Sequence, residues 1–216
     1  MRRFGMLTAL ALAVSTPMAK ASADPALDKV MRQLDASSAK FQSAEGDLKW
    51  DFFEKVVRDT TTQTGSIYFL KAKGGTEMGA VITSPGKKYV RFADGKGELY
   101  DAVAKKTTPF DAGANRGRVE SFLALGFGGS GADMEKSWTI TLLGTETVDG
   151  TSTAKLDLKP KDASTAQSIS HIVMWIDPAR DIPLKQLTYL PEGDTRTAYY
   201  TNIRYNTKVD TKKYKH

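Results

Sequence analysis

Apolar and polar residues alternate with a period of two along most of this chain, and this pattern restricts the possible folds more than any other feature. In residues 47–52, for example, Leu48, Trp50 and Phe52 alternate with charged residues. Because neighbouring side chains of a strand point to opposite faces, such a segment is predicted to be a strand with one apolar and one polar face. Similar segments occupy residues 65–69, 78–82, 89–92, 98–103, 138–142, 154–158, 170–176, 184–190 and 196–205.

Short turns separate these predicted strands, which indicates antiparallel pairing. Asp94-Gly95 and Asp149-Gly150 are typical of tight hairpin turns, since both residue types tolerate positive φ. An antiparallel sheet of about nine or ten strands tends to curl or close rather than stay flat. We therefore expect a mainly β fold built on a curved antiparallel sheet.

Two segments have helical spacing instead. Residues 24–41 carry an apolar residue every three or four positions, after an Asp24-Pro25 pair that is typical of a helix start. Residues 116–125 have the same spacing and are followed by the glycine-rich segment 126–131. We expect an N-terminal helix in the mature chain and an internal helical lid with a flexible exit.

The first 23 residues have the features of a secretory signal peptide. Arg2-Arg3 form a basic start, an apolar stretch follows, and small residues predominate at positions 19–23. The apolar stretch is shorter than the ~20 residues that span a bilayer. We expect cleavage after Ala23 or Ala21, periplasmic localisation, and one domain of residues 24–216.

The composition excludes several classes of site and partner. The chain has no Cys and only two His, so it can form neither a disulfide nor a multi-histidine metal centre. Removing the predicted signal peptide removes three basic residues and no acidic one, so the net charge falls from +6 to +3. Nucleic-acid-binding proteins carry a denser basic patch, and we expect no nucleic-acid partner.

No motif supports an enzyme or a cofactor site. The sequence has no G-x-S-x-G elbow, and His171 lies inside a predicted strand. Gly126, Gly128 and Gly131 match G-x-G-x-x-G, but they follow a predicted helix, whereas a dinucleotide site opens a helix after a strand. We expect no catalytic residues, no cofactor and no metal.

Large apolar and aromatic side chains recur on the predicted strands. They are Trp50, Phe52, Phe69, Tyr89, Phe92, Leu99, Trp138, Trp175, Tyr189 and Tyr199. If they share one face, that face forms an ordinary filled core or, in a partly open barrel covered by few helices, the wall of a ligand cavity. The residues alone leave both possibilities open.

Several short motifs occur in a defined order along residues 24–216. They are Gln63–Phe69, Ala93–Lys96 followed by Leu99-Tyr100, Leu156–Lys161, Asp177–Gln186 and Val209–Tyr214. In order and spacing they resemble the motifs of the LolA family, the periplasmic carriers of outer-membrane lipoproteins. The resemblance implies an unclosed, half-barrel antiparallel sheet, covered by an N-terminal helix and an internal helical lid over an apolar cavity.

The resemblance also implies a function and a set of binding residues. Such a carrier, here expected to be a monomer, takes an acylated lipoprotein from an inner-membrane ATP-driven release complex and passes it to an outer-membrane acceptor. The expected ligand-binding residues are Trp50, Phe52, Ile67, Phe69, Tyr89, Leu99, Trp138 and Trp175 in the wall, with Phe122 and Phe127 on the lid. Lys71 stands where the family commonly has the arginine that latches the lid. Because lysine lacks the fork of donors of arginine, we expect a weaker latch.

Two alternatives remain open beside the lipoprotein carrier. The same scaffold could bind or sense another lipid or amphiphile, or the chain could be a structural or interaction protein with a filled core. The absence of cysteine favours the soluble carrier over the family's anchored acceptor, which requires a lipidated N-terminal Cys.

Overall fold

The computed structural model describes residues 24–73, 75–111 and 125–216. The signal peptide predicted for residues 1–23 and nearly all of the helical lid predicted for residues 116–125 lie outside the described residues.

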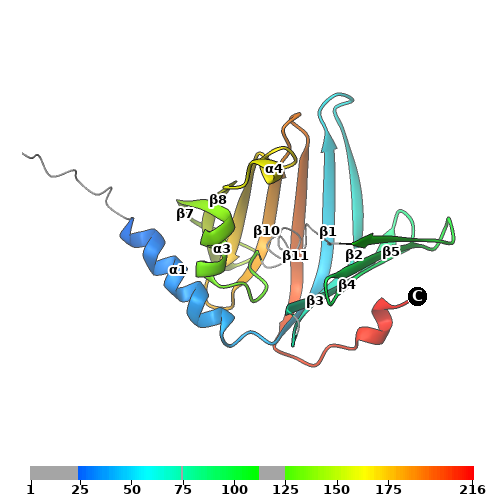
Figure 1. Ribbon diagram of the computed structural model, residues 1–216, viewed down its shortest axis with the longest axis horizontal. Coiled ribbons are helices and arrows are strands. Elements are labelled where there is room, and N and C mark those ends of the chain that lie inside the picture. The colour runs from blue at the N-terminus through cyan, green and yellow to red at the C-terminus, as the bar shows by residue number, and fades with distance from the viewer. Residues whose placement is uncertain (1–23, 74, 112–124) are drawn as a thin grey trace, which may run out of the picture.

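The described strands form one eleven-stranded sheet (Figure 1). They are β1 (Ser43–Glu54), β2 (Asp59–Ala72), β3 (Gly75–Ser84), β4 (Lys88–Ala93), β5 (Lys96–Asp101), β6 (Lys106–Asp111), β7 (Trp138–Val148), β8 (Thr151–Pro160), β9 (His171–Asp177), β10 (Ile182–Tyr189) and β11 (Thr195–Tyr205). Their order is β6-β5-β4-β3-β2-β1-β11-β10-β9-β8-β7, and every pairing is antiparallel. Because β6 and β7 are the two edges, the sheet is not closed. The predicted mainly β, unclosed antiparallel fold is confirmed.

The sheet consists of two meanders joined by one long-range pairing. Strands β1 to β6 pair in sequence order, as do β7 to β11, and β1 pairs with β11. This antiparallel order places the turns of residues 55–58, 85–87, 102–105 and 190–194 at the same end of the sheet. We call this end the distal end.

Strand β6 was absent from the sequence prediction. Its residues Lys106–Asp111 lack the alternation of apolar residues and contain Pro109. An edge strand tolerates a proline, because one side of its backbone makes no ladder hydrogen bonds. Residues 106–111 therefore form a strand because they pair with β5, and their local sequence pattern does not predict it.

In the described residues, four helical segments accompany the sheet: α1 (Pro25–Ser38), α3 (Gly131–Ser137), α4 (Ala163–Ala166) and the 3₁₀ turn η2 (Thr211–Tyr214). Asp24 caps α1 by accepting a hydrogen bond from the backbone N–H of Ala26 at 2.9 Å, and Pro25 occupies its first turn. The predicted N-terminal helix is confirmed, and it ends at Ser38. No helix in the described part of the chain is long and apolar enough to cross a membrane.

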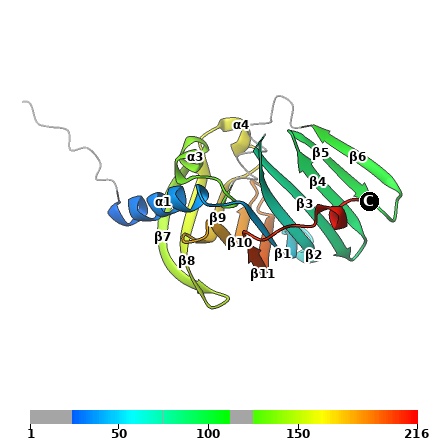
Figure 2. The ribbon, with the colours of Figure 1, turned by 90° about the horizontal axis from the view of Figure 1, so that it is seen from below.

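One face of the sheet, here called the inner face, is covered by α1 and α3 over β7–β9 (Figures 1 and 2). Leu34 of α1 is buried there against side chains such as Leu156 and Met174. A second cluster on the inner face joins β1–β3 to β10 and β11 and includes Phe41 and Phe127.

The opposite, outer face is covered in part by the C-terminal segment, which runs past β3 and β4 (Figure 2). Tyr214 is buried there against Tyr68 and Val81, with the Tyr214 and Tyr68 ring centroids 4.6 Å apart. Tyr214 also donates a hydrogen bond of 2.7 Å to the buried carboxylate of Glu45.

Candidate ligand-binding site

A cavity of about 590 Å³ lies on the inner face of the sheet. Fifteen of its lining residues are apolar or aromatic: Leu48, Trp50, Ile67, Phe69, Met78, Ala80, Ile82, Val90, Leu99, Leu125, Phe127, Ile169, Leu190, Ala198 and Tyr200. The five others are Gln63, Lys88, Gln186, Thr188 and Arg196. A volume between ~300 and ~1,000 Å³ with a mostly apolar wall is typical of sites for small apolar ligands.

Small residues help to keep this part of the inner face hollow. Ala80 on β3 lies between Ile67 and Val90 in the register of the sheet, and Ala198 lies between Trp50 and Gln186. The other half of the inner face is filled, because α1 packs its apolar stripe against β7–β9. The sheet therefore has one filled half and one hollow half.

Phe127 inserts into the hollow half. Its ring stacks on Phe69, with centroids 3.7 Å apart and planes 7° apart, and meets the edge of Tyr200 at 5.1 Å. Tyr200 donates a hydrogen bond of 3.1 Å to Gln186, whose side-chain amide in turn donates one of 3.1 Å to the carbonyl of Leu125. Segment 125–130 is thus tied to both β10 and β11.

Two glycines give segment 125–130 its course. Gly126 and Gly128 both have φ of +88°, a conformation that favours glycine. A Cβ at Gly128 would lie 2.6 Å from the ring of Phe41, so the close approach also requires glycine. The flexible exit predicted for residues 126–131 is, in the structure, a closely packed segment with Leu125 and Phe127 buried.

Asp181, which directly precedes β10, binds segment 125–130 through a hydrogen bond. Its carboxylate is fully buried and accepts a hydrogen bond of 3.0 Å from the backbone N–H of Gly128. Burial raises the pKa of Asp181 to about 8, with a smaller contribution from the charge of Asp35, and the Gly128 hydrogen bond opposes this rise.

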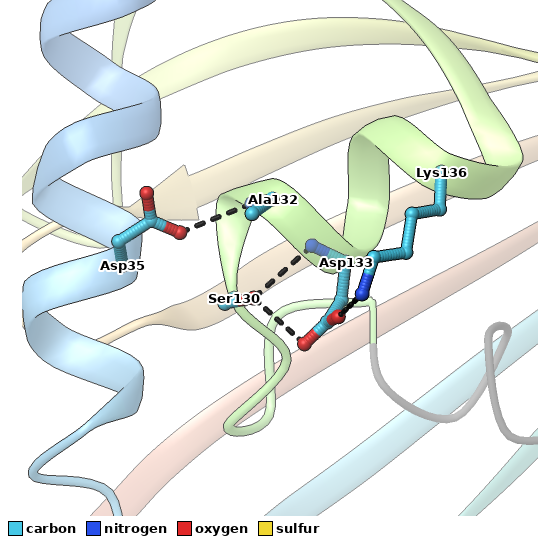
Figure 3. A network of polar contacts seen from close by, with 5 residues as sticks. All are labelled: Asp35, Ser130, Ala132, Asp133 and Lys136. Carbon is cyan, nitrogen blue, oxygen red and sulfur yellow. Dashed lines mark hydrogen bonds and ion pairs between the residues drawn. The ribbon is translucent and has the colours of Figure 1, made fainter.

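A polar network holds the other end of the segment (Figure 3). Ser130 caps α3, accepting a hydrogen bond of 3.0 Å from the N–H of Asp133 and donating one of 2.7 Å to its carboxylate. Asp35 of α1 accepts a hydrogen bond of 3.0 Å from the N–H of Ala132, and Lys136 pairs with Asp133 at 2.6 Å. Helix α1 therefore anchors the segment that carries Phe127.

Charged groups contribute to the cavity wall from strands near the distal end. Arg196 lies over the ring of Phe52 at 5.1 Å, and its guanidinium donates hydrogen bonds of 3.2 and 3.1 Å to the carbonyls of Phe53 and Thr195. Lys88, at the start of β4, is 3.8 Å from Asp101. The cavity is therefore amphipathic, with an apolar body and two cations in its wall.

The structure brings together five of the predicted binding residues. Trp50, Ile67, Phe69, Leu99 and Phe127 line the cavity. Phe122 lies outside the described residues. Phe52 shares the inner face with Trp50, with ring centroids 4.6 Å apart, but lies beyond the wall beneath Arg196.

Three other predicted wall residues lie elsewhere in the fold. Trp138 is part of the filled core under α1. Tyr89 and Trp175 point to the outer face, because Val90 and Met174 beside them point inward. Trp175 is only 4% exposed there, since Lys155 and Lys185 lie over its ring at 4.8 and 4.3 Å.

Sequence reasoning missed the polar members of the wall. Gln63, Gln186, Thr188 and Arg196 alternate in phase with apolar inner-face residues, so the strand period could have found them. They were not assigned to the wall because residues at inner-face positions were expected to be apolar.

Lys71 contacts α1 in the described part of the chain. Its ammonium donates a long hydrogen bond of 3.4 Å to the carbonyl of Ser38, the last residue of the helix. The expected latch to a lid at residues 116–125 involves chain outside the described residues.

No cluster of three or more potential metal-ligating side chains occurs within the described ranges. His171 pairs with Asp157 at 2.5 Å and stacks on Tyr189, but this group does not line the cavity.

An open antiparallel sheet with one filled half and one hollow, apolar half defines the structural class of this chain. No protein-family model matches the sequence, and no curated protein is significantly similar to it. Solved structures do share the fold. MucB is 13% identical over 89% of this chain and 63% of its own, with a TM-score of 0.57. The lipoprotein LppX of Mycobacterium tuberculosis is 14% identical over 87% of this chain and 99% of its own, with a TM-score of 0.52.

These matches show that nearly the whole chain shares this fold. The predicted likeness to the LolA-like proteins is confirmed as a likeness of fold. A LolA superfamily protein from Nitrosomonas europaea is also among the matches, at 11% identity over 86% of this chain and 96% of its own, with a TM-score of 0.41. This chain spans about 60% of the length of the MucB chains that it matches.

Proposed function

We propose that this protein is a periplasmic carrier that binds acyl chains of lipoproteins in its inner-face cavity and ferries them from the inner to the outer membrane. The observation that carries the proposal is the cavity of about 590 Å³ with a mostly apolar wall. The basic and apolar start of the sequence supports export, and the motifs that resemble those of the LolA family support the choice of cargo.

The size of the cavity suits reversible binding. Three acyl chains of ~16 carbons, fully buried at ~0.8 kcal/mol per CH₂, would release about 40 kcal/mol. Reversible affinities do not exceed about 20 kcal/mol, so a carrier that delivers its cargo must bury only part of these chains. The inner-membrane release complex and the outer-membrane acceptor are the partners that such a cycle requires.

Binding residues within the cavity have distinct expected roles. Trp50, Ile67, Phe69 and Leu99 would contact the acyl chain. Phe127, which stacks on Phe69, occupies space that a longer chain would take.

Ligand capture by the purified, exported protein tests the proposal. An acylated lipoprotein should change the fluorescence of Trp50 and remain bound through gel filtration, whereas the non-acylated form should not. Ala198→Phe fills the cavity beside Trp50 and should weaken binding at least about tenfold. Thr201→Phe adds the same ring to an exposed position of β11 and should leave binding unchanged. Failure to retain any acylated ligand would refute the carrier function.

A second candidate is the binding or sensing of another lipid or amphiphile on the same scaffold. Lys88 and Arg196 in the wall favour it, since they could meet an anionic head group. Mass spectrometry of the ligand that co-purifies from the native periplasm separates the two: a lipidated peptide supports the carrier, and a free lipid supports the alternative.

A further inference from the structure

Four large apolar side chains are exposed among the described residues, and three of them lie on two turns of the distal end. Val56 and Val57, in the β1–β2 turn, are 95% and 64% exposed, and Val103, in the β5–β6 turn, is 76% exposed. The fourth, Leu143, is 51% exposed on the edge strand β7. Turns favour Gly, Pro, Asn, Asp and Ser, so turn geometry does not account for these valines.

The two turns share a second feature. In each, the last turn residue is a cation with left-handed backbone: Arg58 has φ of +55° and Lys105 has φ of +52°. Glycine or asparagine adopts this conformation more easily. Both turns therefore combine exposed valine with a cation one or two residues later, at a position where another residue type would be less strained.

A third turn adds charge between them. Lys87 and Lys88 follow the end of β3, and the carbonyl of Lys87 accepts a hydrogen bond of 3.0 Å from the N–H of Ala102. We define the distal rim as residues 54–59, 85–88 and 101–106. It contains six basic and three acidic residues, a net charge of +3, and the adjoining turn 190–194 of the distal end adds Glu192 and Asp194, which lowers the total to +1. Lys88 is also part of the cavity wall.

We infer that the distal rim docks on the surface of an anionic lipid bilayer, with the exposed valines inserted among the head groups and the cations against the lipid phosphates. Apolar side chains flanked by lysine and arginine are the features that bind such an interface. The β1–β2 hairpin suits this role, because it extends past the end of β3 and stands out from the sheet (Figure 1).

A bilayer fits this rim better than a protein or a nucleic acid. Protein interfaces concentrate binding in contiguous, well-packed aromatic and arginine anchors, whereas these valines lie on two separate turns. The described rim has no aromatic residue on which bases could stack, and its net charge is small. A fluid bilayer accepts separate apolar tips without requiring a matching pocket.

Docking of this kind would bring the cationic part of the cavity wall to the lipid surface. An acyl chain would then have a short path from the bilayer to the cavity. This consequence rests on the proposed carrier function, because only a carrier takes up an acyl chain. The docking itself does not depend on the cargo.

Sedimentation with vesicles tests the inference. The exported protein should sediment with vesicles of phosphatidylethanolamine and phosphatidylglycerol but not with vesicles of phosphatidylcholine alone. Because each cation near an anionic surface strengthens binding about fivefold, added salt should weaken the binding. Val56→Ser, Val57→Ser and Val103→Ser combined should reduce it about tenfold or more, whereas Leu143→Ser, which removes an exposed aliphatic group far from the distal rim, should change it less than about twofold.

The outcomes separate docking from cargo binding. Equal sedimentation with neutral and anionic vesicles, or an unchanged affinity of the triple variant, overturns the inference. If the triple variant loses vesicle binding but retains an acylated ligand in solution, docking and capture are distinct functions of one molecule. If no ligand is captured but vesicle binding behaves as expected, the carrier function fails and the docking surface stands.

Discussion

The ring of Phe127 lies parallel to that of Phe69 at a centroid distance of 3.7 Å, so a residue from outside the sheet forms part of the cavity wall. The stacking joins segment 125–130 to β2 and determines how much of the hollow half remains empty.

Phe127→Ala should lower stability and enlarge the cavity. Phe127 is 3% exposed, and truncation of a buried phenylalanine costs about 3 kcal/mol of unfolding free energy. The vacated volume should also let the protein bind bulkier acyl ligands. Urea unfolding measures the first effect and ligand titration the second. Phe127→Leu, which retains most of the side-chain volume, should show smaller changes, and equal effects of both variants would contradict the role of the stacked ring.

Gly128→Ala should destabilise the protein more than Gly150→Ala. Both glycines have positive φ, +88° and +75°, so either alanine incurs backbone strain of about 1 kcal/mol. Only at Gly128 would the new Cβ also meet another group, the ring of Phe41, whereas nothing lies within 4 Å at Gly150. Chemical unfolding of the two variants compares the costs. If both variants lose the same unfolding free energy, segment 125–130 can move away from Phe41 at no cost in stability, and the close contact at Gly128 does not matter.

Stability should fall as pH rises from about 4 to about 8, because of Asp181. Burial raises the pKa of this carboxyl to about 8 in the folded protein, against an ordinary value of 3.8, so unfolding releases its proton across this range. Each pH unit then lowers the unfolding free energy by at most about 1.4 kcal/mol. Asp181→Asn cannot titrate, and its amide oxygen can still accept the Gly128 hydrogen bond. This variant should show a flatter pH profile in thermal unfolding, and an unchanged profile would exclude Asp181 as the cause.

Glu45→Gln should loosen the C-terminal segment at neutral pH and not in acid. Burial alone would raise the pKa of Glu45, but hydrogen bonds from Lys213, Tyr214 and Arg204 outweigh burial and lower it. The resulting stabilisation is present above the ordinary carboxyl pKa and is lost as pH falls through the lowered value. We expect a loss of about 1–3 kcal/mol at pH 7 that narrows below about pH 4.

Limited proteolysis at the C-terminus and urea unfolding at both pH values measure this effect. Asp47→Asn, on the exposed outer face of the same strand, is the matched control and should change little. If Glu45→Gln lowers the unfolding free energy equally at pH 3 and pH 7, the stabilisation by Glu45 does not come from its charge.

The strand pattern of the sequence predicted most of the sheet, because alternation is a local property of each segment. Helix α1 was also predictable, since Asp24 and Pro25 act within its first turn. Strand β6 was not, because its residues take strand form by pairing with β5.

The candidate site was only partly predictable, because it depends on which face each side chain occupies. Trp50 and Phe69 lie in clearly alternating segments, and both line the cavity. Tyr89 and Trp175 lie in segments where apolar residues occupy both faces, so composition could not assign them, and both point outward.

The sequence by itself determined the class of fold: alternating segments with short turns can satisfy their backbone groups and bury their apolar faces only as an antiparallel sheet. The tertiary structure alone decided where that sheet is hollow. Pairing of β1 with β11, packing of α1 on β7–β9 and burial of Asp181 beneath Gly128 join residues far apart in the chain. Because a cavity is the volume that such distant neighbours leave unfilled, no local pattern could reveal its size or its lining.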